Sequence, residues 1–328
     1  MPTSFLLLTG RDVRAALPLH DLVDTMASVV AAYSAGEAVQ PLRTVLEVDE
    51  SRFYGLMPAY IRARSALGTK LLSFFPANAA VGLPTHMATV ALLDPVSGQL
   101  LAIMDGSYLT EVRTAAVSVV SARYLARPGA SRLAILGTGV QARSHLRALA
   151  ASFDLTAVRV WNPLPGHSDR FVAEMCDLAR TNLRAAASAE DAVRDADLVV
   201  TVTVSPTPVV DTSWVADGAH VMAIGACRPD QRELDPRLVA RSRLFVDSRA
   251  AALVEAGDVV IGIREGYFGR DHVAGELGEL VLGRVAGRRS PAEVTVFKSL
   301  GMAVEDVAAA ELAYRCALEA GVGQRLAL

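Results

Sequence analysis

The sequence lacks the features that mark several common classes of protein. Its three cysteines, Cys176, Cys227 and Cys316, form neither an even set nor a CxxC pair, so we expect a reducing compartment and no disulfide framework. No run of 18 or more apolar residues is free of charges and turn-forming residues, which argues against a membrane span. Residues 1–11 include an apolar run but no cationic start and no cleavage-type site, so we expect a mature cytoplasmic protein.

Missing charge clusters and missing motifs narrow the function further. The 32 Lys+Arg and 35 Asp+Glu give a formal net charge of −3, and no basic cluster of the kind that neutralises nucleic-acid phosphates is present. No two histidines or cysteines are spaced as metal ligands, and no Gly-x-Ser-x-Gly elbow of a serine hydrolase occurs. We therefore expect a small-molecule substrate, with no metal site, no nucleic-acid partner and no membrane partner.

The first hundred residues combine one helix with several strands. The 328 residues are enough for about two domains at roughly 150 residues each. Apolar residues between 18 and 33 recur at helical spacing. Asp94–Gly98 is typical of a tight turn, so the segments on either side are predicted to pair antiparallel. The strands predicted in this part are 43–48, 53–57, 69–75, 87–93 and 100–105.

Further along the chain, short apolar strands alternate with helices, as in βαβ units and a parallel, doubly wound sheet. We therefore predict an α/β fold in which a Rossmann-type domain, 114–305, is inserted in an α+β domain, 1–113 plus 306–328. A closing amphipathic helix is predicted at 299–318. The other predicted helices are 114–125, 141–152, 168–181 and 189–194, and the predicted strands of this part are 132–136, 158–161, 198–204, 220–224 and 244–247.

A glycine-rich loop lies between a predicted strand and a predicted helix. It reads Gly137-Thr138-Gly139-Val140-Gln141-Ala142, a GxGxxA pattern. The glycines permit a tight turn and close approach of the backbone to a pyrophosphate, while the helix N-terminus supplies N–H groups and a positive dipole end. Such a pattern is also found in plain turns, but its position favours a dinucleotide. The predicted contacts are Gly137, Thr138, Gly139, Val140 and Gln141.

The end of the next strand bears on which dinucleotide is bound. Trp161 is followed by Asn162 and not by the carboxylate that usually binds the ribose 2′-OH of NAD. Without that carboxylate a 2′-phosphate is not repelled, so NADP(H) is favoured and NAD(H) is the alternative. His167 and Arg170 are the nearby cations, and we predict that Asn162 and Arg170 contact the cofactor.

Three cations, Arg43, Lys70 and Arg113, lie at the edges of strand-like runs. A solvated face explains any one of them alone. Arg113, however, precedes the predicted helix 114–125, where a cation is unfavourable because the helix dipole is already positive there. We therefore predict that Arg113 binds a carboxylate or phosphate. His86 is open to two interpretations, a core histidine or a contact on the nicotinamide side.

Taken together, six segments resemble the ornithine cyclodeaminase/mu-crystallin family. The resemblance extends from Arg43 to Tyr314 and is nearest to the mu-crystallin branch of NADPH-dependent ketimine reductases. It implies a homodimer in which residues 1–113 and 306–328 form the substrate and dimerisation domain. The segments are Arg113-Thr114-Ala115-Ala116, the loop 137–142, Gly225-Ala226-Cys227-Arg228-Pro229-Asp230, Arg232-Glu233-Leu234-Asp235, Val246-Asp247-Ser248 and residues 297–306.

The resemblance also implies roles for individual residues. Arg43 and Arg113 would hold the substrate carboxylate, and Lys70 would lie beside the reacting carbon. Thr85 and His86 match a Ser-His pair near the cofactor. Arg113 would also contact the cofactor.

Departures from the family pattern separate this chain from the cyclodeaminases. Cys227 stands where that branch has an Asp for the amine and leaving-group chemistry, and a thiol with a pKa of about 8.5 is a poor base. We interpret Cys227 as lining the pocket, in contact with substrate and cofactor, and not as a nucleophile. Met57 stands where cyclodeaminases carry an acid for the ammonium group. Pro163-Leu164 replaces an Arg-Thr pair that binds the 2′-phosphate in mu-crystallin, which weakens the expected NADPH preference.

The first hypothesis is therefore an NAD(P)H-dependent imine reductase with Lys70 and Arg113 as catalytic residues. It would reduce a cyclic ketimine carboxylate of the pyrroline- or piperideine-2-carboxylate type to the cyclic amino acid. The alternatives are an alanine-type amino-acid dehydrogenase, an ornithine cyclodeaminase, or a protein that binds NAD(P)H and a small ligand with little turnover. Three cations of this kind favour catalysis over pure binding.

Overall fold

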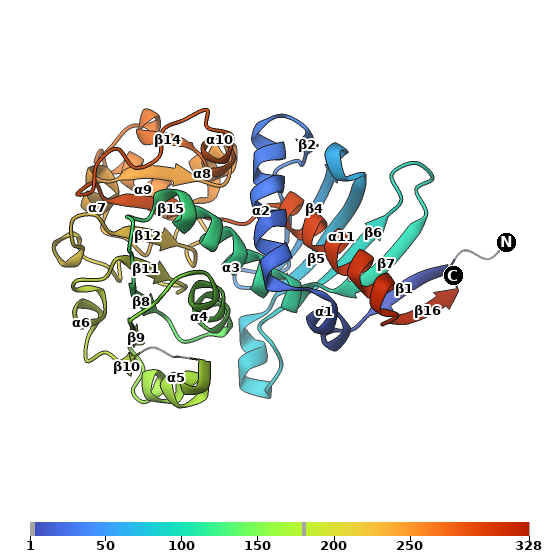
Figure 1. Cartoon of the computed structure of the whole chain (residues 1–328), viewed down its shortest axis with the longest axis horizontal. Coiled ribbons are helices and arrows are strands. Elements are labelled where there is room, and N and C mark those ends of the chain that lie inside the picture. Colours follow the sequence, from blue (N-terminus) through green and yellow to red (C-terminus); the bar gives the residue numbers. More distant parts are fainter. Residues whose placement is uncertain (1–3, 179–181, 328) are drawn as a thin grey trace. The chain divides into compact units, whose positions relative to one another are not determined.

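The computed structural model describes residues 4–178 and 182–327, which divide into two compact units (Figure 1). Unit 1 contains the described residues up to Ala116 and from Gly301 onward, and unit 2 runs from Val117 to Leu300. Unit 2 is thus inserted in the chain of unit 1. The predicted boundaries fell after residues 113 and 305.

Unit 1 contains one mixed sheet, made of β1 (Ser4–Leu8), β2 (Ala38–Val39), β3 (Thr44–Glu47), β4 (Phe53–Ile61), β5 (Ala66–Phe74), β6 (His86–Leu93), β7 (Leu100–Asp105) and β16 (Gln324–Ala327). Their order is β16-β1-β7-β6-β5-β4-β2, with β3 paired to β4. Only β1 and β7 run parallel among these described strands. The helices and short 3-10 turns are α1 (Gly10–Ala16), α2 (Leu19–Ser34), η1 (Arg62–Arg64), η2 (Pro76–Val81), α11 (Ala303–Ala320) and the start of α3 (Gly106–Leu125).

Helix α11 covers one face of this sheet, packing against β4, β5, β6 and α2. Strand β5 shows why its sequence suits that position, because alternate residues point to opposite faces of a strand. Ala66, Gly68, Lys70 and Leu72 are the buried positions, whereas the residues between them are half-buried. Lys70 therefore occupies an inward position among small and apolar residues. Gly68 is required there, since a Cβ would lie 2.6 Å from the carbonyl oxygen of Ala91.

The turn predicted at 94–98 joins β6 to β7 in an antiparallel hairpin, which confirms that prediction. Asp94 Oδ1 accepts hydrogen bonds from the N–H groups of Val96 and Ser97 at 3.0 and 2.7 Å. Gly98 follows with φ of +72°, a left-handed conformation that glycine adopts without a Cβ penalty.

Unit 2 contains a sheet in which all described neighbours are parallel, with the order β10-β9-β8-β11-β12-β15-β13-β14. The strands are β8 (Arg132–Leu136), β9 (Ala157–Trp161), β10 (Asn182–Ala185), β11 (Leu198–Thr201), β12 (His220–Ala223), β13 (Arg243–Val246), β14 (Val273–Glu276) and β15 (Thr295–Lys298). The helices and 3-10 turns are α4 (Val140–Ser152), α5 (His167–Met175), η3 (Cys176–Leu178), α6 (Ala189–Val193), η4 (Thr212–Trp214), α7 (Pro236–Arg241), α8 (Arg249–Glu255), α9 (Gly257–Arg264), η5 (Arg270–His272) and α10 (Leu277–Val281).

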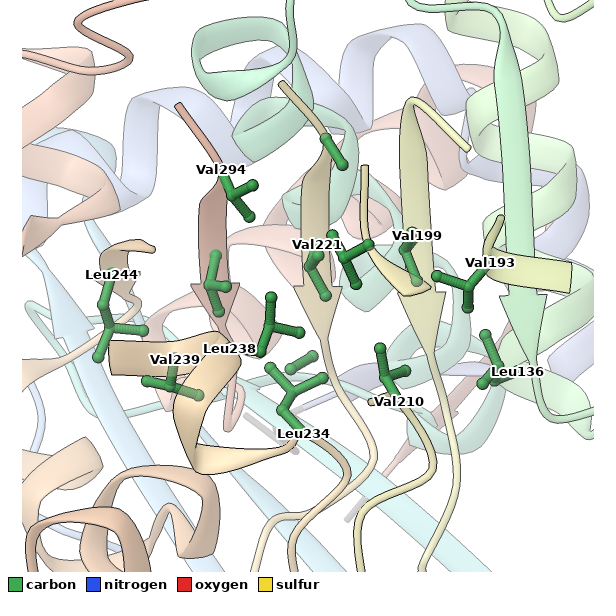
Figure 2. Packing of buried hydrophobic residues seen from close by; sticks show 14 of the residues in the cluster. Leu136, Val193, Val199, Val210, Val221, Leu234, Leu238, Val239, Leu244 and Val294 are labelled. Atoms are coloured by element: carbon green, nitrogen blue, oxygen red, sulfur yellow. The ribbon is translucent and has the colours of Figure 1, made fainter. Parts of the chain in front are cut away.

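The strand order of unit 2 confirms the predicted Rossmann-type fold. From β8 the chain moves outward through β9 to β10, then returns to β11 on the other side of β8. This reversal is the switch point beside which doubly wound sheets bind nucleotides. Strands β11, β12 and β15 are buried at every position, as expected for parallel strands covered on both faces. Figure 2 shows Val199 and Val221 on neighbouring strands within this core.

Several boundaries differ from the sequence prediction. Residues 295–298 form β15, so the last helix begins at Ala303 and not at 299. Helix α5 ends at Met175, and the end predicted for it, Thr181, lies outside the described residues. Helix α3 begins at Gly106, eight residues before the predicted start. Asp105 Oδ1 accepts from the N–H of Tyr108 at 2.8 Å, which caps this earlier first turn.

Gly106 follows the strand predicted at 100–105, and glycine is a weak helix former. In the structure a Cβ at this position would lie 2.9 Å from the carbonyl carbon of Ala88, so close approach to β6 requires glycine.

Among residues 4–178 and 182–327, no single helix is long and apolar enough to cross a membrane. The pair α1 and α2, which meet at 87°, satisfies the length and composition criteria only when taken together.

Candidate active site

The predicted site residues fall in both units, and each set is described within its own unit. In unit 1, Met57 of β4 and Lys70 of β5 are direct cross-strand partners. Their side chains share the inward face, and they are only 4% and 2% exposed. The sheet register thus brings two of the predicted substrate contacts together. Met57 offers no charge that could bind an ammonium group.

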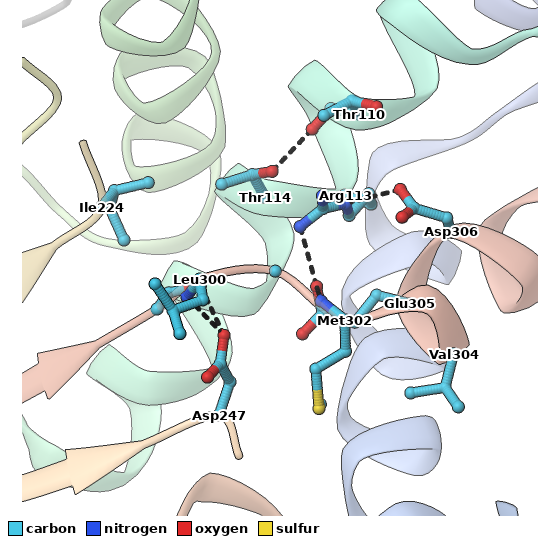
Figure 3. A network of polar contacts seen from close by, with 12 residues as sticks. Thr110, Arg113, Thr114, Ile224, Asp247, Leu300, Met302, Val304, Glu305 and Asp306 are labelled. Carbon is cyan, nitrogen blue, oxygen red and sulfur yellow. Dashed lines mark hydrogen bonds and ion pairs between the residues drawn. The ribbon is translucent and has the colours of Figure 1, made fainter. Parts of the chain in front are cut away.

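The account of Arg113 at a helix start is wrong. Because α3 begins at Gly106, Arg113 lies about two turns inside the helix, away from the positive dipole end. Arg113 nevertheless binds anions, and they are carboxylates of the protein itself. Arg113 Nη1 donates to Glu305 Oε2 at 2.8 Å, and Arg113 Nε donates to Asp306 Oδ1 at 2.9 Å (Figure 3). Two buried carboxylates on the first turn of α11 therefore hold the guanidinium in place.

Asp306 also contacts Lys70, a link that sequence analysis missed. Lys70 Nζ lies 3.2 and 3.1 Å from the two carboxylate oxygens of Asp306. Asp306 and Glu305 are both fully buried. Glu305 and Asp306 are the last two residues of the segment 297–306, which carries part of the family resemblance. That resemblance was the one feature of the sequence that could have pointed to them. Their partners lie more than 190 positions away in sequence, so no local pattern could pair them.

Gly301 connects the remaining predicted arginine to this group. Arg43 Nη2 donates to the carbonyl oxygen of Gly301 at 3.3 Å. A Cβ on Gly301 would lie 2.6 Å from Arg113 Nη1, and the residue has φ of +78°. Only glycine meets both conditions without strain. Unit 1 thus gathers Arg43, Met57, Lys70 and Arg113 into one cluster.

Burial and neighbouring charges tune the titratable groups of this cluster. The pKa of Lys70 is lowered to about 8. Burial is the largest cause, Arg113 and Arg43 lower the pKa further, and Asp306 opposes them by raising it. Burial would raise the pKa of Asp306, but the cations Arg113 and Lys70 hold it below its usual value. A lysine with a pKa near 8 can donate a proton close to neutral pH, which suits general acid catalysis.

His86 begins β6, and burial, with a further contribution from Lys70, lowers its pKa to about 4. The imidazole is therefore neutral at pH 7. The carbonyl oxygen of Thr85 accepts a hydrogen bond from the N–H of Phe75 at 2.8 Å, which fixes the backbone before the strand. Contact of Thr85 and His86 with a cofactor stays a prediction.

In unit 2, the glycine-rich loop joins β8 to α4, as predicted. Gly137 has φ of +113°, and a Cβ there would lie 2.8 Å from the carbonyl oxygen of Val202. Gly139 is the N-cap of α4 and makes no side-chain cap hydrogen bond. Gln141 Oε1 is buried and has no hydrogen-bond partner among the described residues. The N–H groups at the start of α4 fit the phosphates of a dinucleotide, whereas Gln141 Oε1 is an acceptor and would need a donor.

Two side chains hold the shape of this loop. Asn162 Nδ2 donates to Thr138 Oγ1 at 3.0 Å, and Asn162 Oδ1 accepts from the N–H of Leu164 at 2.9 Å. Arg143 Nη1 donates to the carbonyl oxygen of Thr138 at 2.6 Å. Asn162, predicted as a cofactor contact, is thus already bound to the loop, and Arg143 is a supporting residue that sequence analysis missed.

An open cavity of about 590 Å³ lies beside the end of β9. Its charged lining residues are Asp169 and Arg184, and Arg184 makes hydrogen bonds to both carboxylate oxygens of Asp191, at 3.0 and 2.9 Å. Arg170 is exposed and is not one of the described residues that line the cavity. The lining residues are Trp161, Asn162, Pro163, Leu164, Pro165, Gly166, Ser168, Asp169, Arg184, Ala185, Ala186 and Ala187.

Cys227 lies on the loop that follows β12. The buried side chain of Glu233 holds this loop through hydrogen bonds to its backbone. Glu233 accepts hydrogen bonds from the N–H groups of Thr203, Gly225 and Ala226 at 2.5, 2.7 and 3.2 Å. Burial raises the pKa of Glu233. A Cβ on Gly225 would lie 1.9 Å from the carbonyl oxygen of Thr203, so only glycine fits. Cys227 itself is partly exposed, and its contact with substrate and cofactor stays a prediction.

A buried ion pair lies in the same region of unit 2. Lys298 Nζ lies 3.2 Å from Asp258 Oδ2, and both side chains are almost fully buried. Burial alone would lower the pKa of Lys298, but Asp258, Cys227 and Glu233 raise it above its usual value. The cation therefore balances the buried carboxylates in this part of unit 2.

Comparisons with known proteins find relatives that are similar over most of the chain. The sequence profile of the ornithine cyclodeaminase/mu-crystallin family matches residues 4–321. The ketimine reductase mu-crystallin of Rattus norvegicus is 43% identical over 300 residues, which are 89% of this chain and 91% of that protein.

Two solved structures are also similar over nearly the whole chain. The Delta(1)-pyrroline-2-carboxylate reductase of Thermococcus litoralis, in complex with NADH and L-proline, is 36% identical with a TM-score of 0.95, covering 98% of this chain and 99% of that one. An archaeal alanine dehydrogenase dimer with bound NAD is 33% identical with a TM-score of 0.93, at the same coverage. The resemblance inferred from the six segments is confirmed, and the chain belongs to the ornithine cyclodeaminase/mu-crystallin family.

Proposed function

We propose that the protein is an NAD(P)H-dependent imine reductase that converts a cyclic ketimine carboxylate, of the pyrroline- or piperideine-2-carboxylate type, into the cyclic amino acid. The observation that carries the proposal is the cluster of Arg43, Lys70 and Arg113. It occurs in a chain that matches, over 98% of its length, a reductase whose structure holds NADH and L-proline.

Each residue of the cluster has a role in this reaction. Arg43 and Arg113 bind the substrate carboxylate and so orient the adjacent C2 atom. Lys70 donates a proton to the ring nitrogen, and the C=N bond becomes CH–NH. When bound, the reduced nicotinamide supplies the hydride that C2 receives. Residues 1–113 and 306–328 would thus serve the substrate, and 114–305 the dinucleotide.

Met57 and Cys227 support reduction over cyclodeamination. An ornithine cyclodeaminase has to bind a second ammonium group, yet Met57, the partner of Lys70 across the sheet, is apolar and buried. Cys227 is a thiol where the cyclodeaminases carry a carboxylate. The similarity to an archaeal alanine dehydrogenase makes an amino-acid dehydrogenase the second candidate.

A substrate panel separates these candidates. Oxidation of NADPH and NADH is followed with pyrroline-2-carboxylate, piperideine-2-carboxylate, and pyruvate with ammonia or methylamine. We expect turnover with the cyclic imines. Oxidation only with pyruvate and ammonia would identify a dehydrogenase, and no turnover with any substrate would favour a binding protein.

For the cofactor, we propose that NADPH binds at least as well as NADH, because no carboxylate follows Trp161 directly. Asp169 is the acid that lines the cavity, so Asp169→Asn should favour NADPH further, and Arg170→Ala should weaken NADPH alone if Arg170 reaches the 2′-phosphate. Titration of protein fluorescence with each cofactor measures both. A tenfold preference of the wild type for NADH, about 1.4 kcal/mol, would overturn the proposal.

We also propose a homodimer in a reducing, cytoplasmic compartment. The alanine dehydrogenase relative is a dimer, and large apolar side chains are exposed on β3, β4 and β6 of unit 1, namely Val45, Leu46, Leu56 and Met87. All three cysteines are free thiols. Light scattering should give twice the chain mass of 34.7 kDa, and the mass of a single chain at micromolar concentration would refute the dimer.

A further inference from the structure

Lysine is rare in this protein, and both lysines lie in buried ion pairs. The sequence contains 30 arginines but only Lys70 and Lys298. Lys70 lies 3.1 Å from Asp306, and Lys298 lies 3.2 Å from Asp258. Arginine stays charged at all ordinary pH values, whereas a buried lysine can gain and lose a proton. A lysine where the chain otherwise uses arginine therefore points to proton transfer at Lys70, as the proposed function requires.

We propose that Asp306 is a positioning residue for the proposed reductase reaction: its carboxylate fixes Lys70 and Arg113 together and keeps Lys70 protonated for transfer to the imine nitrogen. The inference rests on the proposed function for its chemistry, and on the geometry of unit 1 for the contact itself.

The geometry supports this role because one carboxylate serves two cations from different elements. Asp306 Oδ1 lies 2.9 Å from Arg113 Nε, and both of its oxygens lie within 3.2 Å of Lys70 Nζ. Lys70 comes from β5, Arg113 from α3 and Asp306 from α11. All three side chains are at least 95% buried. Asp306 therefore sets the spacing between the proton donor and the cation assigned to the substrate carboxylate.

The charges around Lys70 leave Asp306 as its direct anionic contact. Arg113 on α3 and Arg43 before β3 disfavour the protonated amine, and His86 on β6 is neutral at pH 7. Glu305 is the other acid of this cluster, and it binds Arg113 Nη1 and the N–H of Met302. Removing the charge of Asp306 would leave Lys70 facing two arginines. The protonated form would then be disfavoured.

The test exploits the small number of lysines. Protein labelled with 13C at the lysine side chain gives two Cε signals, assigned with the variant Lys70→Met, and each is titrated with pH. In Asp306→Asn we expect the midpoint of the Lys70 signal to fall by about 1–3 pH units, as for the loss of an adjacent opposite charge. The Lys298 signal, from unit 2, should keep its midpoint and reports that the protein remains folded.

Glu305→Gln is the matched control, since it also removes a buried carboxylate that binds Arg113 but has a different partner set. We expect the Lys70 midpoint to move by less than a third as much as in Asp306→Asn. Equal shifts in the two variants, or no shift in Asp306→Asn, would overturn the inference. If Asp306→Asn fails to fold, Asp306→Glu keeps the charge, and its Lys70 midpoint should remain within half a pH unit of the wild type.

Kinetics test the catalytic part separately. In Asp306→Asn, kcat/KM for a cyclic imine at pH 7.5 should fall about tenfold or more, and its alkaline limb should move to lower pH, because kcat/KM reports the free enzyme. A uniform loss at every pH would indicate a merely structural role and contradict the proposal. Absence of turnover in the wild type would refute the proposed function, whereas the NMR midpoints would still decide whether Asp306 controls Lys70.

Discussion

Replacing Arg113 with lysine keeps the charge but removes the rigid fork that contacts two carboxylates. In the structure Nη1 and Nε of Arg113 bind Glu305 and Asp306 separately, at 2.8 and 2.9 Å. A single ammonium on a shorter reach cannot retain both contacts. The variant therefore loses at least one buried hydrogen bond between charged groups.

Typical free energies for contacts of this kind give the size of both effects. A hydrogen bond to a charged group contributes about 1.5–3 kcal/mol, so the free energy of unfolding should fall by that amount. The substrate carboxylate would still be attracted, but C2 would be less well oriented. We expect kcat/KM to fall by one to two orders of magnitude, about 1.4–2.7 kcal/mol of transition-state stabilisation. Affinity for the dinucleotide should change less, because it depends on the loop 137–142.

Urea denaturation followed by far-UV circular dichroism measures the first effect, and steady-state kinetics the second. Arg64→Lys is a suitable control, since Arg64 also pairs with a glutamate of α11, Glu311, but the pair is partly exposed. It should cost no more than about 1 kcal/mol and leave kcat/KM unchanged. An Arg113→Lys protein with wild-type stability and wild-type kcat/KM would refute both the contacts of Arg113 with two carboxylates and its role in orienting the substrate carboxylate.

Three other predictions concern unit 2. Burial lowers the pKa values of His145 and His220 to about 4 and about 3, below the ordinary value of 6.5. The unfolded chain therefore binds protons more readily than the folded one below pH 6.5. Urea midpoints should be constant between pH 6.5 and about 8, where these histidines are neutral in both states, and should fall as the pH drops toward 4. His145→Gln should make the urea midpoint fall less steeply with decreasing pH, and an unchanged fall would contradict the role assigned to His145. Lys298→Met leaves Asp258 buried without its cation and should cost about 3–5 kcal/mol by chemical denaturation; a loss below about 1 kcal/mol would be inconsistent with a buried pair. Cys227→Ser should leave kcat/KM within a few-fold of the wild type, while inactivity would demand covalent chemistry at the thiol.

Much of unit 2 could be predicted because its signals are local. The loop 137–142 follows a short apolar strand and precedes a helix, and each of these features is read from adjacent residues. Strand β15 was missed because 295–298 is a short apolar run beside Gly301, where the motif suggested a helix start. Neither periodicity nor length separates such runs from the end of a buried helix.

The site in unit 1 depends on contacts between distant residues. Arg43, Lys70 and Arg113 could be selected as unusual cations and by their resemblance to the family. Their carboxylate partners could not be selected, because Asp306 lies 236 positions from Lys70 and 193 from Arg113. Only the packing of α11 on β4, β5 and β6 brings them together. Arg113 was expected to need an anion because it was predicted to lie at a helix start, and that reason was wrong; the anions that it binds are Glu305 and Asp306.

Transfer of deuterium from the cofactor tests the central claim most directly. NADH or NADPH deuterated at C4 of the nicotinamide, with each epimer used separately, is incubated with the protein and pyrroline-2-carboxylate or piperideine-2-carboxylate. The amino acid formed is analysed by mass spectrometry and NMR. The account predicts proline or pipecolate with one deuterium at C2 from one of the two epimers. Cofactor oxidation without the amino acid, or an amino acid with no deuterium at C2 from either epimer, would contradict it.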